Sequence, residues 1–142
     1  MEDNSSRSDA DNCFVCGTKN PIGLKIVFQY NDGQCVGEFT PQANHVGFDG
    51  VVHGGIIFSA LDDVMANWLY LQGGRGFTAK CEIRYREPLP VGVTVRLTCE
   101  LQQRKRQLLQ LHSKAVRVDN DTVVAEADGR FMIAEEGNIA QS

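Results

Sequence analysis

The chain has 142 residues, of which 42% are hydrophobic and 23% charged, a composition typical of one soluble globular domain. Its formal net charge of −4 lies in the two ends, because residues 1–12 carry −3, residues 134–142 carry −2 and the segment between them carries +1. A nearly neutral interior argues against a nucleic-acid partner and against a trap for acidic substrates. We expect one domain over residues 13–133, with a disordered tail at each end.

The five cysteines and the polar N-terminus indicate a reducing compartment. No apolar stretch precedes Cys13, so no signal peptide is expected, and scattered cysteines in odd number favour free thiols in the cytoplasm. Cys13 and Cys16 form one C-x-x-C pair, but a second pair at ligand spacing is missing. The sequence therefore predicts neither a metal site nor a cofactor, and gives only weak support to a redox pair.

The first elements in chain order are a hairpin and a loop. Residues 24–30 and 34–40 read as two paired strands around the tight turn Asn31-Asp32-Gly33. Residues 41–52, rich in Asn, His and Gly, predict a loop.

The next element is an apolar run of helix length over residues 53–71, which ends near Gly73-Gly74. Its length would allow it to span a membrane, but Asp62 and Asp63 in its middle would be costly in lipid. A helix buried inside the protein is the better interpretation, and no membrane partner is expected. A buried carboxylate must be paired, neutralised or used, so these acids are the best clue to function.

The second half of the chain changes to a period of two. Residues 77–85 predict a strand with one buried face that carries Phe77, Ala79, Cys81, Ile83 and Tyr85. Further strands are expected over residues 93–101, 108–118 and 122–133. Because a helix that is apolar on nearly all sides must be wrapped or covered, the pattern predicts an α+β hot-dog fold. Its long central helix is wrapped by a curved antiparallel sheet of about six strands.

Three segments carry a resemblance to a known family: CFVCGTKNPIGLKIVF at 13–28, HVGFDGVVHGGIIFSALDD at 45–63 and TAKCEIRYREPLPVG at 78–92. The second is the most specific, because His-Gly-Gly opens an apolar helix that has an acid nine residues after the histidine. Together they resemble the hot-dog acyl-CoA thioesterases of the phenylacetate-pathway (PaaI-like) group. The resemblance implies hydrolysis of an acyl-CoA thioester to a free acid and coenzyme A.

The resemblance also implies roles for individual residues. Gly54 would offer its backbone N–H to the thioester carbonyl, Asp62 would be the catalytic carboxylate, and Thr78 would assist. Some relatives carry an asparagine six residues before the histidine, where this chain has Gly47. Asn44 and His45 are the nearest polar candidates for that substrate contact.

The chemistry of these residue types agrees with those roles. A helix N-terminus has unpaired N–H groups and a partial positive charge, so Gly54 and Gly55 would let a thioester oxygen approach. The alternative is that both glycines only allow close packing. An acid in apolar surroundings has a raised pKa, which suits a general base near neutral pH. Direct attack by the carboxylate of Asp62 is the competing mechanism.

Other candidates have weaker support. His53 would lie on the helix face opposite Asp62, which favours capping or orienting the glycine amides over catalysis. Leu61 and Met65 are candidates for shaping the acyl pocket. The run Arg104-Lys105-Arg106 either meets the phosphates of coenzyme A or forms a solvated turn. Asp63 receives no role.

One distance predicts the assembly. Gly54 and Asp62 are eight residues apart, roughly 12 Å along a helix, which one carbonyl and its attacking water cannot bridge. We therefore expect the two groups of each site to come from different chains of a homodimer, possibly within a homotetramer. The alternatives are a non-catalytic module that binds acyl-CoA or an acyl carrier and, less favoured, an enoyl-CoA hydratase.

Overall fold

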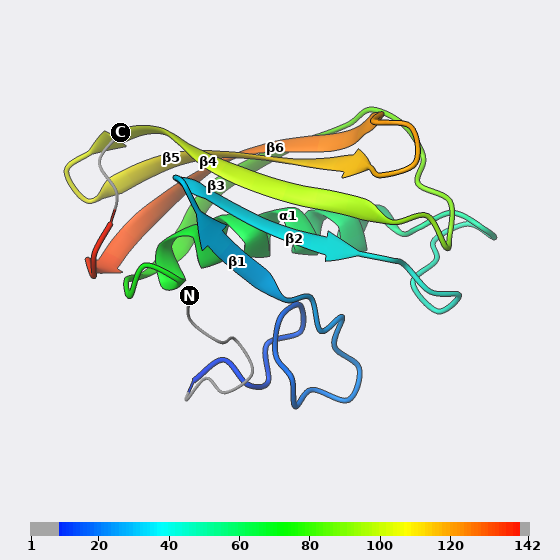
Figure 1. Ribbon diagram of the computed structural model, residues 1–142, viewed down its shortest axis with the longest axis horizontal. Helices are drawn as coiled ribbons and strands as arrows, with labels where there is room; N and C mark the ends of the chain where they lie inside the picture. Colours follow the sequence, from blue (N-terminus) through cyan, green and yellow to red (C-terminus); the bar gives the residue numbers. More distant parts are fainter. Residues whose placement is uncertain (1–8, 140–142) are drawn as a thin grey trace.

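One helix lies against the concave face of a single antiparallel sheet (Figure 1). The structure is a computed structural model that describes residues 9–139. In chain order the elements are β1 (Phe28–Asn31), β2 (Gln34–Phe39), α1 (Gly54–Tyr70), β3 (Arg75–Tyr85), β4 (Val95–Lys105), β5 (Leu108–Arg117) and β6 (Val123–Glu135). The six strands are arranged in the order β1-β2-β4-β5-β6-β3, so β3 forms one edge of the sheet. The predicted fold, a long helix wrapped by about six antiparallel strands, is confirmed.

The predicted hairpin forms, but its first strand is shorter than expected. Asp32 and Gly33 have φ angles of 50° and 81°, as the tight turn between β1 and β2 requires. Strand β1 begins only at Phe28, not at residue 24. The backbone N–H groups of Leu24 and Ile26 bond instead to carbonyls of the N-terminal segment, and Lys25 between them has a φ of 56°.

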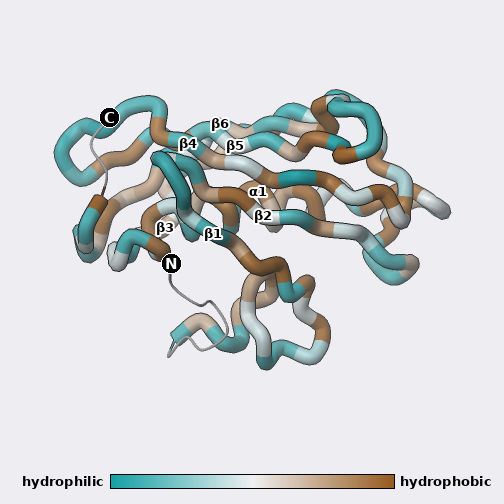
Figure 2. The backbone as a smooth tube through the Cα atoms, in the orientation of Figure 1, coloured by the Kyte–Doolittle hydropathy of each residue, from teal (hydrophilic) through white to brown (hydrophobic). Residues whose placement is uncertain are grey.

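The core lies between α1 and the sheet. In Figure 2 the strands change between hydrophobic and hydrophilic colours along their length, as expected of strands with one buried face. The largest fully buried side chains come from the helix and from several strands, and they include Trp68, Leu61, Met65, Leu69, Phe28, Leu97, Leu109, Leu111 and Phe131. This burial holds α1 in one position under the sheet.

Strand β3 is more exposed than its sequence pattern predicts. Phe77 is 60% exposed and Tyr85 is 52% exposed, and Cys81 and Ile83 are only half-buried. The prediction of a buried face carrying Phe77 is therefore wrong. The register with β6 shifts between Thr78 and Lys80, so Phe77 lies on the same face as its partner Met132, opposite to the face of Thr78 and Phe131. The strand also pairs only with β6, which leaves its other edge open.

The expected tails are shorter than predicted where the structure describes them. Strand β6 continues through Glu135, and Ile139 packs in the core, so the end of the domain lies beyond residue 133. Asp11 accepts a hydrogen bond from the Lys19 backbone, which ties down part of the predicted N-terminal tail. Residues 1–8 and 140–142 of the predicted tails lie outside the described residues. No helix between residues 9 and 139 is long and apolar enough to cross a membrane.

Candidate functional site

The start of α1 uses one glycine amide and leaves the other free. His53 is the N-cap, and its Nδ1 accepts a hydrogen bond from the Gly55 N–H at 2.8 Å. The His53 carbonyl accepts from Ile56 and Ile57 in the first turn. Within residues 9–139 the Gly54 N–H has no hydrogen-bond partner. Gly54 is therefore the amide at this helix start that is available to a ligand oxygen.

Tyr85 closes one side of the helix start. Its hydroxyl donates to the Gly54 carbonyl at 2.8 Å, and a Cβ on Gly54 would lie 3.3 Å from the tyrosine ring. Gly54 is thus needed partly for close packing, as the alternative interpretation of the glycines proposed. Sequence reasoning treated Tyr85 only as part of a buried strand face.

Asp62 is hydrogen-bonded to Thr78, the residue that the resemblance names as a helper in the reaction. The Thr78 hydroxyl donates to Asp62 Oδ1 at 2.8 Å. Burial raises the pKa of the Asp62 carboxyl above its ordinary value, the Thr78 hydrogen bond lowers it, and the nearby charge of Cys13 raises it. The net direction is upward, which is the direction expected for a carboxylate that acts as a base near neutral pH.

A β-bulge in β3 lets Thr78 and Tyr85 both face α1. They are seven residues apart, so in a regular strand their side chains would point to opposite faces of the sheet. The register with β6 shifts between Thr78 and Lys80, so Ala79 is the extra residue. One extra residue reverses the alternation, and bulges next to functional sites commonly re-aim a side chain in this way.

Gly54 and Asp62 do not meet within one chain. They lie in one continuous helix and are held by different residues of β3, Tyr85 and Thr78. Eight helical residues span roughly 12 Å, so their reactive groups cannot act together on one carbonyl within this chain.

The other predicted site residues differ in how deeply the structure buries them. Leu61 and Met65 are fully buried, and a Cβ on Gly129 of β6 would lie 2.8 Å from the Met65 sulfur. Both side chains therefore pack in the core under the sheet. Asn44 is exposed, while Nδ1 of half-buried His45 accepts from the Gln42 backbone N–H at 2.9 Å.

Asp63 faces a different part of the chain. Its Oδ1 lies 3.7 Å from the Cys13 sulfur, and its Oδ2 accepts from the Asn67 side chain at 3.0 Å. The pKa of Cys13 is lowered to about 5, chiefly by hydrogen bonding from the Cys16 side chain, while burial acts in the opposite direction. Sequence reasoning missed this cluster, because Asp63 is fifty residues away from Cys13 in the chain.

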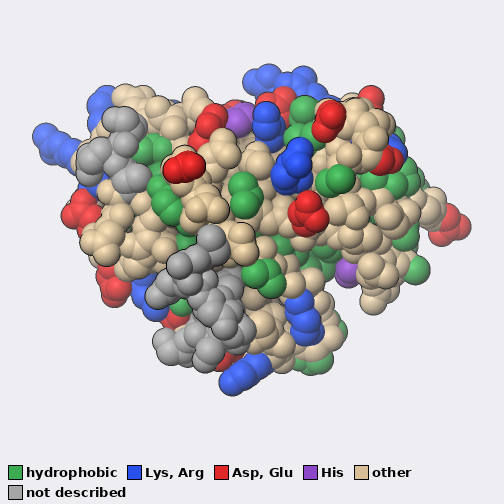
Figure 3. Space-filling model, viewed as in Figure 1, with side chains coloured by type: hydrophobic (Ala, Val, Ile, Leu, Met, Phe, Trp, Pro, Cys, Tyr) green, Lys and Arg blue, Asp and Glu red, His purple; other side chains and the backbone are tan. Residues whose placement is uncertain are grey.

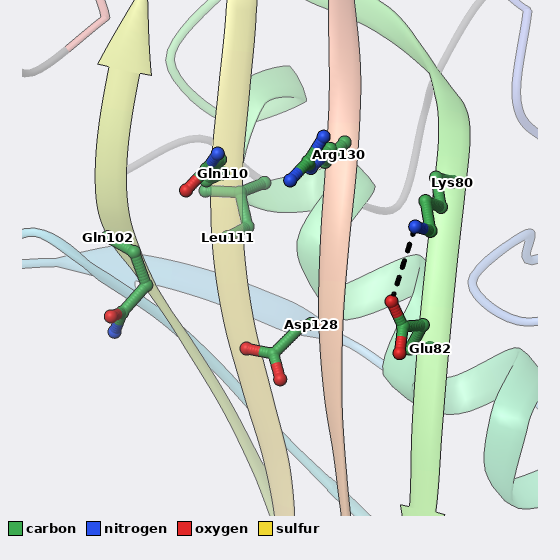
Figure 4. A pocket seen from close by; sticks show the side chains of 7 residues that line it. All are labelled: Lys80, Glu82, Gln102, Gln110, Leu111, Asp128 and Arg130. Atoms are coloured by element: carbon green, nitrogen blue, oxygen red, sulfur yellow. Dashed lines mark ion pairs between the residues drawn. The ribbon is translucent and has the colours of Figure 1, made fainter.

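The outer face of the sheet carries a separate cavity of about 210 Å³. Figure 4 shows its lining residues, which are Lys80, Glu82, Gln102, Gln110, Leu111, Asp128 and Arg130. Asp62 is not among them. Over the face seen in Figure 3, basic and acidic side chains are interspersed. Arg104, at the predicted hairpin end between β4 and β5, forms an ion pair with Glu136.

A family model described as the thioesterase superfamily matches residues 49–125, which is more than half of the chain and includes Gly54, Asp62 and Thr78. The human acyl-coenzyme A thioesterase THEM5 is 30% identical over 107 residues, which cover 75% of this chain and 43% of that protein. The chain thus spans less than half the length of this curated relative.

Solved structures with the same fold include several thioesterases. The thioesterase superfamily protein RHA08564 matches with a TM-score of 0.77 at 27% identity, covering 83% of this chain and 61% of that one. The PaaI protein of E. coli, from the phenylacetic acid degradation operon, matches with a TM-score of 0.73 at 24% identity, covering 82% of this chain and 84% of that one. The chain belongs to the thioesterase superfamily, as the resemblance predicted, and it shares its fold with the PaaI protein.

A hypothetical thioesterase of Streptococcus pneumoniae TIGR4, solved with coenzyme A, has a TM-score of 0.73 at 16% identity, covering 79% of this chain and 90% of that one. Two further structures of it carry alanine in place of an aspartate and of a threonine sixteen positions later.

Proposed function

We propose that this chain, which belongs to the thioesterase superfamily, hydrolyses an acyl-CoA thioester to a free acid and coenzyme A. The observation that carries the proposal is the hydrogen-bonded pair of Asp62 and Thr78, on the helix whose free Gly54 N–H supplies the second group that the reaction needs. The name of the curated relative THEM5 supports acyl-CoA as the substrate class.

In this proposal the Gly54 N–H binds the thioester oxygen. Negative charge develops on that oxygen as the tetrahedral intermediate forms, and the partial positive charge of the helix N-terminus adds to the stabilisation. One such donor contributes about 3–4 kcal/mol to the transition state. Gly55 cannot supply it while its N–H is bound to His53, so His53 acts as a positioning residue.

Asp62 activates the attacking group. As a general base it takes a proton from water, the water oxygen bonds to the carbonyl carbon, and the C–S bond then breaks as coenzyme A leaves with a proton. As a nucleophile it would bond to the carbonyl carbon itself, the C–S bond would break as coenzyme A leaves, and water would then hydrolyse the mixed anhydride. Thr78 holds Oδ1 in either case and leaves Oδ2 for the reaction.

The separation of Gly54 and Asp62 makes the site dependent on a second copy of the chain. We propose that two copies join along the open edge of β3, which is eleven residues long and exposes Phe77 and Tyr85. Such an isologous interface repeats every contact twice, so Gly54 of one copy meets Asp62 of the other at two equivalent sites. Assembly into a tetramer and a cytoplasmic location stay predictions.

Release of free thiol from short, medium and aryl acyl-CoAs tests the activity. We expect turnover on at least one of them and its near-complete loss in Asp62→Asn. Tight binding of acyl-CoA without thiol release would instead identify a binding module, and hydration of an enoyl-CoA would identify a hydratase. Label in Asp62 after a single turnover in ¹⁸O-water would identify the nucleophilic mechanism, because water that opens the anhydride at the Asp62 carboxyl carbon leaves its oxygen there.

Mixing two inactive variants tests the shared site. Gly54→Pro removes the N–H at the first helical position, where proline is well tolerated, and the φ of −61° and ψ of 132° at His53 suit a residue that precedes proline. After random exchange with Asp62→Asn, half of the dimers contain one intact site, so about a quarter of wild-type activity should return. A mixture that exchanges subunits but stays inactive would place both groups of each site in one chain.

A further inference from the structure

We propose that Cys13, Cys16 and Asp63 form a zinc site that joins the N-terminal segment to α1. The inference is independent of the proposed function, because none of the three residues takes part in the reaction described above. It also revises the expectation from sequence, in which a second ligand pair was missing.

The ligand atoms are already close together. One sulfur from each cysteine and one carboxylate oxygen of Asp63 all lie within 4.8 Å of one another, and the Cys13 sulfur is 3.7 Å from Asp63 Oδ1. With zinc–sulfur bonds of about 2.3 Å and zinc–oxygen bonds of about 2.0 Å, a tetrahedral site needs a sulfur–oxygen separation of roughly 3.5 Å. The observed arrangement therefore requires only small side-chain movements to hold the ion.

The backbone around the two cysteines has a fixed shape. The Cys16 N–H points at the Cys13 sulfur at 3.5 Å, and the Gly17 N–H bonds to the Cys13 carbonyl at 3.0 Å. A Cβ on Gly17 would lie 2.4 Å from both the Asp11 carbonyl oxygen and the Cys13 nitrogen, so only glycine fits. This tight turn brings both sulfurs to one side of the segment.

Two backbone hydrogen bonds from residues 24–26 also hold the segment that carries the two cysteines. The carbonyls of Phe14 and Val15, between the two cysteines, accept hydrogen bonds from Leu24 and Ile26 at 2.8 and 2.9 Å. These are the bonds that shorten β1. The segment is therefore held in place before any ion binds, which reduces the entropy lost on binding.

Asn67 supplies the outer support that metal ligands usually have. It is only 1% exposed, and its Nδ2 donates to Asp63 Oδ2 at 3.0 Å and to the Asp63 carbonyl at 2.9 Å. This leaves Asp63 Oδ1 directed to the cysteines. Asn67 Nδ2 also lies 3.7 Å from the Cys16 sulfur, so one buried amide contacts two of the three ligand residues. Asn67 Oδ1 is buried without a hydrogen-bond partner in the described part of the chain.

The donor set selects the metal. Two thiolates and one carboxylate suit zinc, whereas magnesium and calcium prefer oxygen ligands throughout. Three protein ligands leave the fourth tetrahedral position for water. Because Asp63 is fifty residues from Cys13, the ion would close a long loop and hold the helix turn that also carries Asp62.

Metal titration of the reduced full chain tests the proposal. After removal of metal with a chelator, we expect one Zn²⁺ per chain to bind, and Co²⁺ in its place to give the thiolate charge-transfer and tetrahedral d–d absorption bands. Failure to bind zinc, or a cobalt spectrum without thiolate bands, would overturn it. A Cys13–Cys16 disulfide in protein purified without oxidant, detected by intact mass, would also overturn it.

Variants assign the ligands. Cys13→Ser and Cys16→Ser should abolish the thiolate bands, and Asp63→Asn should weaken zinc binding by at least about tenfold while keeping the sulfur signal. Cys81→Ser removes a half-buried thiol of β3 outside the cluster and should still bind one zinc per chain. Equal affinity in Asp63→Asn and wild type, with circular dichroism unchanged, would remove Asp63 from the site.

Discussion

Asp62 and Asp63 are adjacent in α1 but belong to two different sides of the helix. Consecutive helical residues point about 100° apart, so Asp62 turns toward the edge strand β3 and Asp63 toward the N-terminal segment. Asp62 accepts one hydroxyl hydrogen bond, whereas Asp63 is held by an amide and faces two sulfurs. The comparison shows how one turn of a buried helix can hold two carboxylates, each suited to different chemistry by its neighbours.

The largest expected effect is a difference in kcat between variants of the two acids. Asp62→Asn should lower kcat by about 10²–10⁴-fold, because the carboxylate that activates water or attacks the thioester is lost. The matched variant Asp63→Asn should lower kcat less than about tenfold, because Asp63 does not contact the reacting atoms. Both are measured by thiol release. A similar loss in the two variants would mean that the two sides of the helix are not functionally distinct.

The next effect concerns the start of the same helix. Gly54→Pro should lower kcat by about 10²–10³-fold through loss of one N–H donor. Gly54→Ala adds a side-chain carbon near Tyr85 but keeps the N–H, so the difference between the two variants reports the hydrogen bond itself. Steady-state kinetics of both variants on one acyl-CoA measure this difference in kcat. Equal losses in both variants would attribute the effect to crowding against Tyr85.

A smaller effect should appear in the pH dependence. The Thr78 hydrogen bond lowers the pKa of Asp62, so Thr78→Ala should raise that pKa and move the acidic limb of kcat/KM to higher pH. Thr78→Ser keeps the hydroxyl and should leave the limb close to its wild-type position. An unshifted limb in Thr78→Ala would show that a group other than Asp62 controls it.

The smallest effect is on stability. Burial raises the pKa of Asp62 in the folded state above its unfolded value, so the folded state binds the proton more tightly. The protonated Asp62 therefore stabilises the fold at low pH. This stabilisation is lost as the pH rises from the ordinary pKa of the unfolded state through the raised pKa of the folded state. Asp62→Asn should therefore melt a few degrees higher than wild type at neutral pH, and the gain should disappear in acid. Thermal melts from pH 3 to 8 measure it, and a gain that persists in acid would contradict this cause.

Much of the fold could be predicted because its signals are local. The period of two in the later strands, the glycines after the helix and the turn at Asp32-Gly33 each depend on neighbouring residues. The resemblance named Asp62 and Thr78 as site residues, and the structure adds the hydrogen bond between them.

The parts that sequence reasoning missed depend on contacts between distant segments. Nothing near Phe77 in the chain shows that its strand lies at the sheet edge or that Ala79 is an extra residue, since both depend on how β3 pairs with β6. Likewise, the third member of the Cys13–Cys16 cluster comes from the middle of the helix. The sequence also does not show which side of this apolar helix packs against the sheet, where Leu61 and Met65 are fully buried.

The bulge at Ala79 has a consequence for how relatives of this chain can diverge. Moving the extra residue along β3, by one insertion and one deletion, would exchange which side chains point at the helix without changing the composition of the strand. The residues available to an acyl group could then change abruptly, while the hydrogen bonds between β3 and β6 are largely kept. A shift of this bulge along the strand is therefore a route to new substrate preferences that a comparison of aligned residue types would overlook.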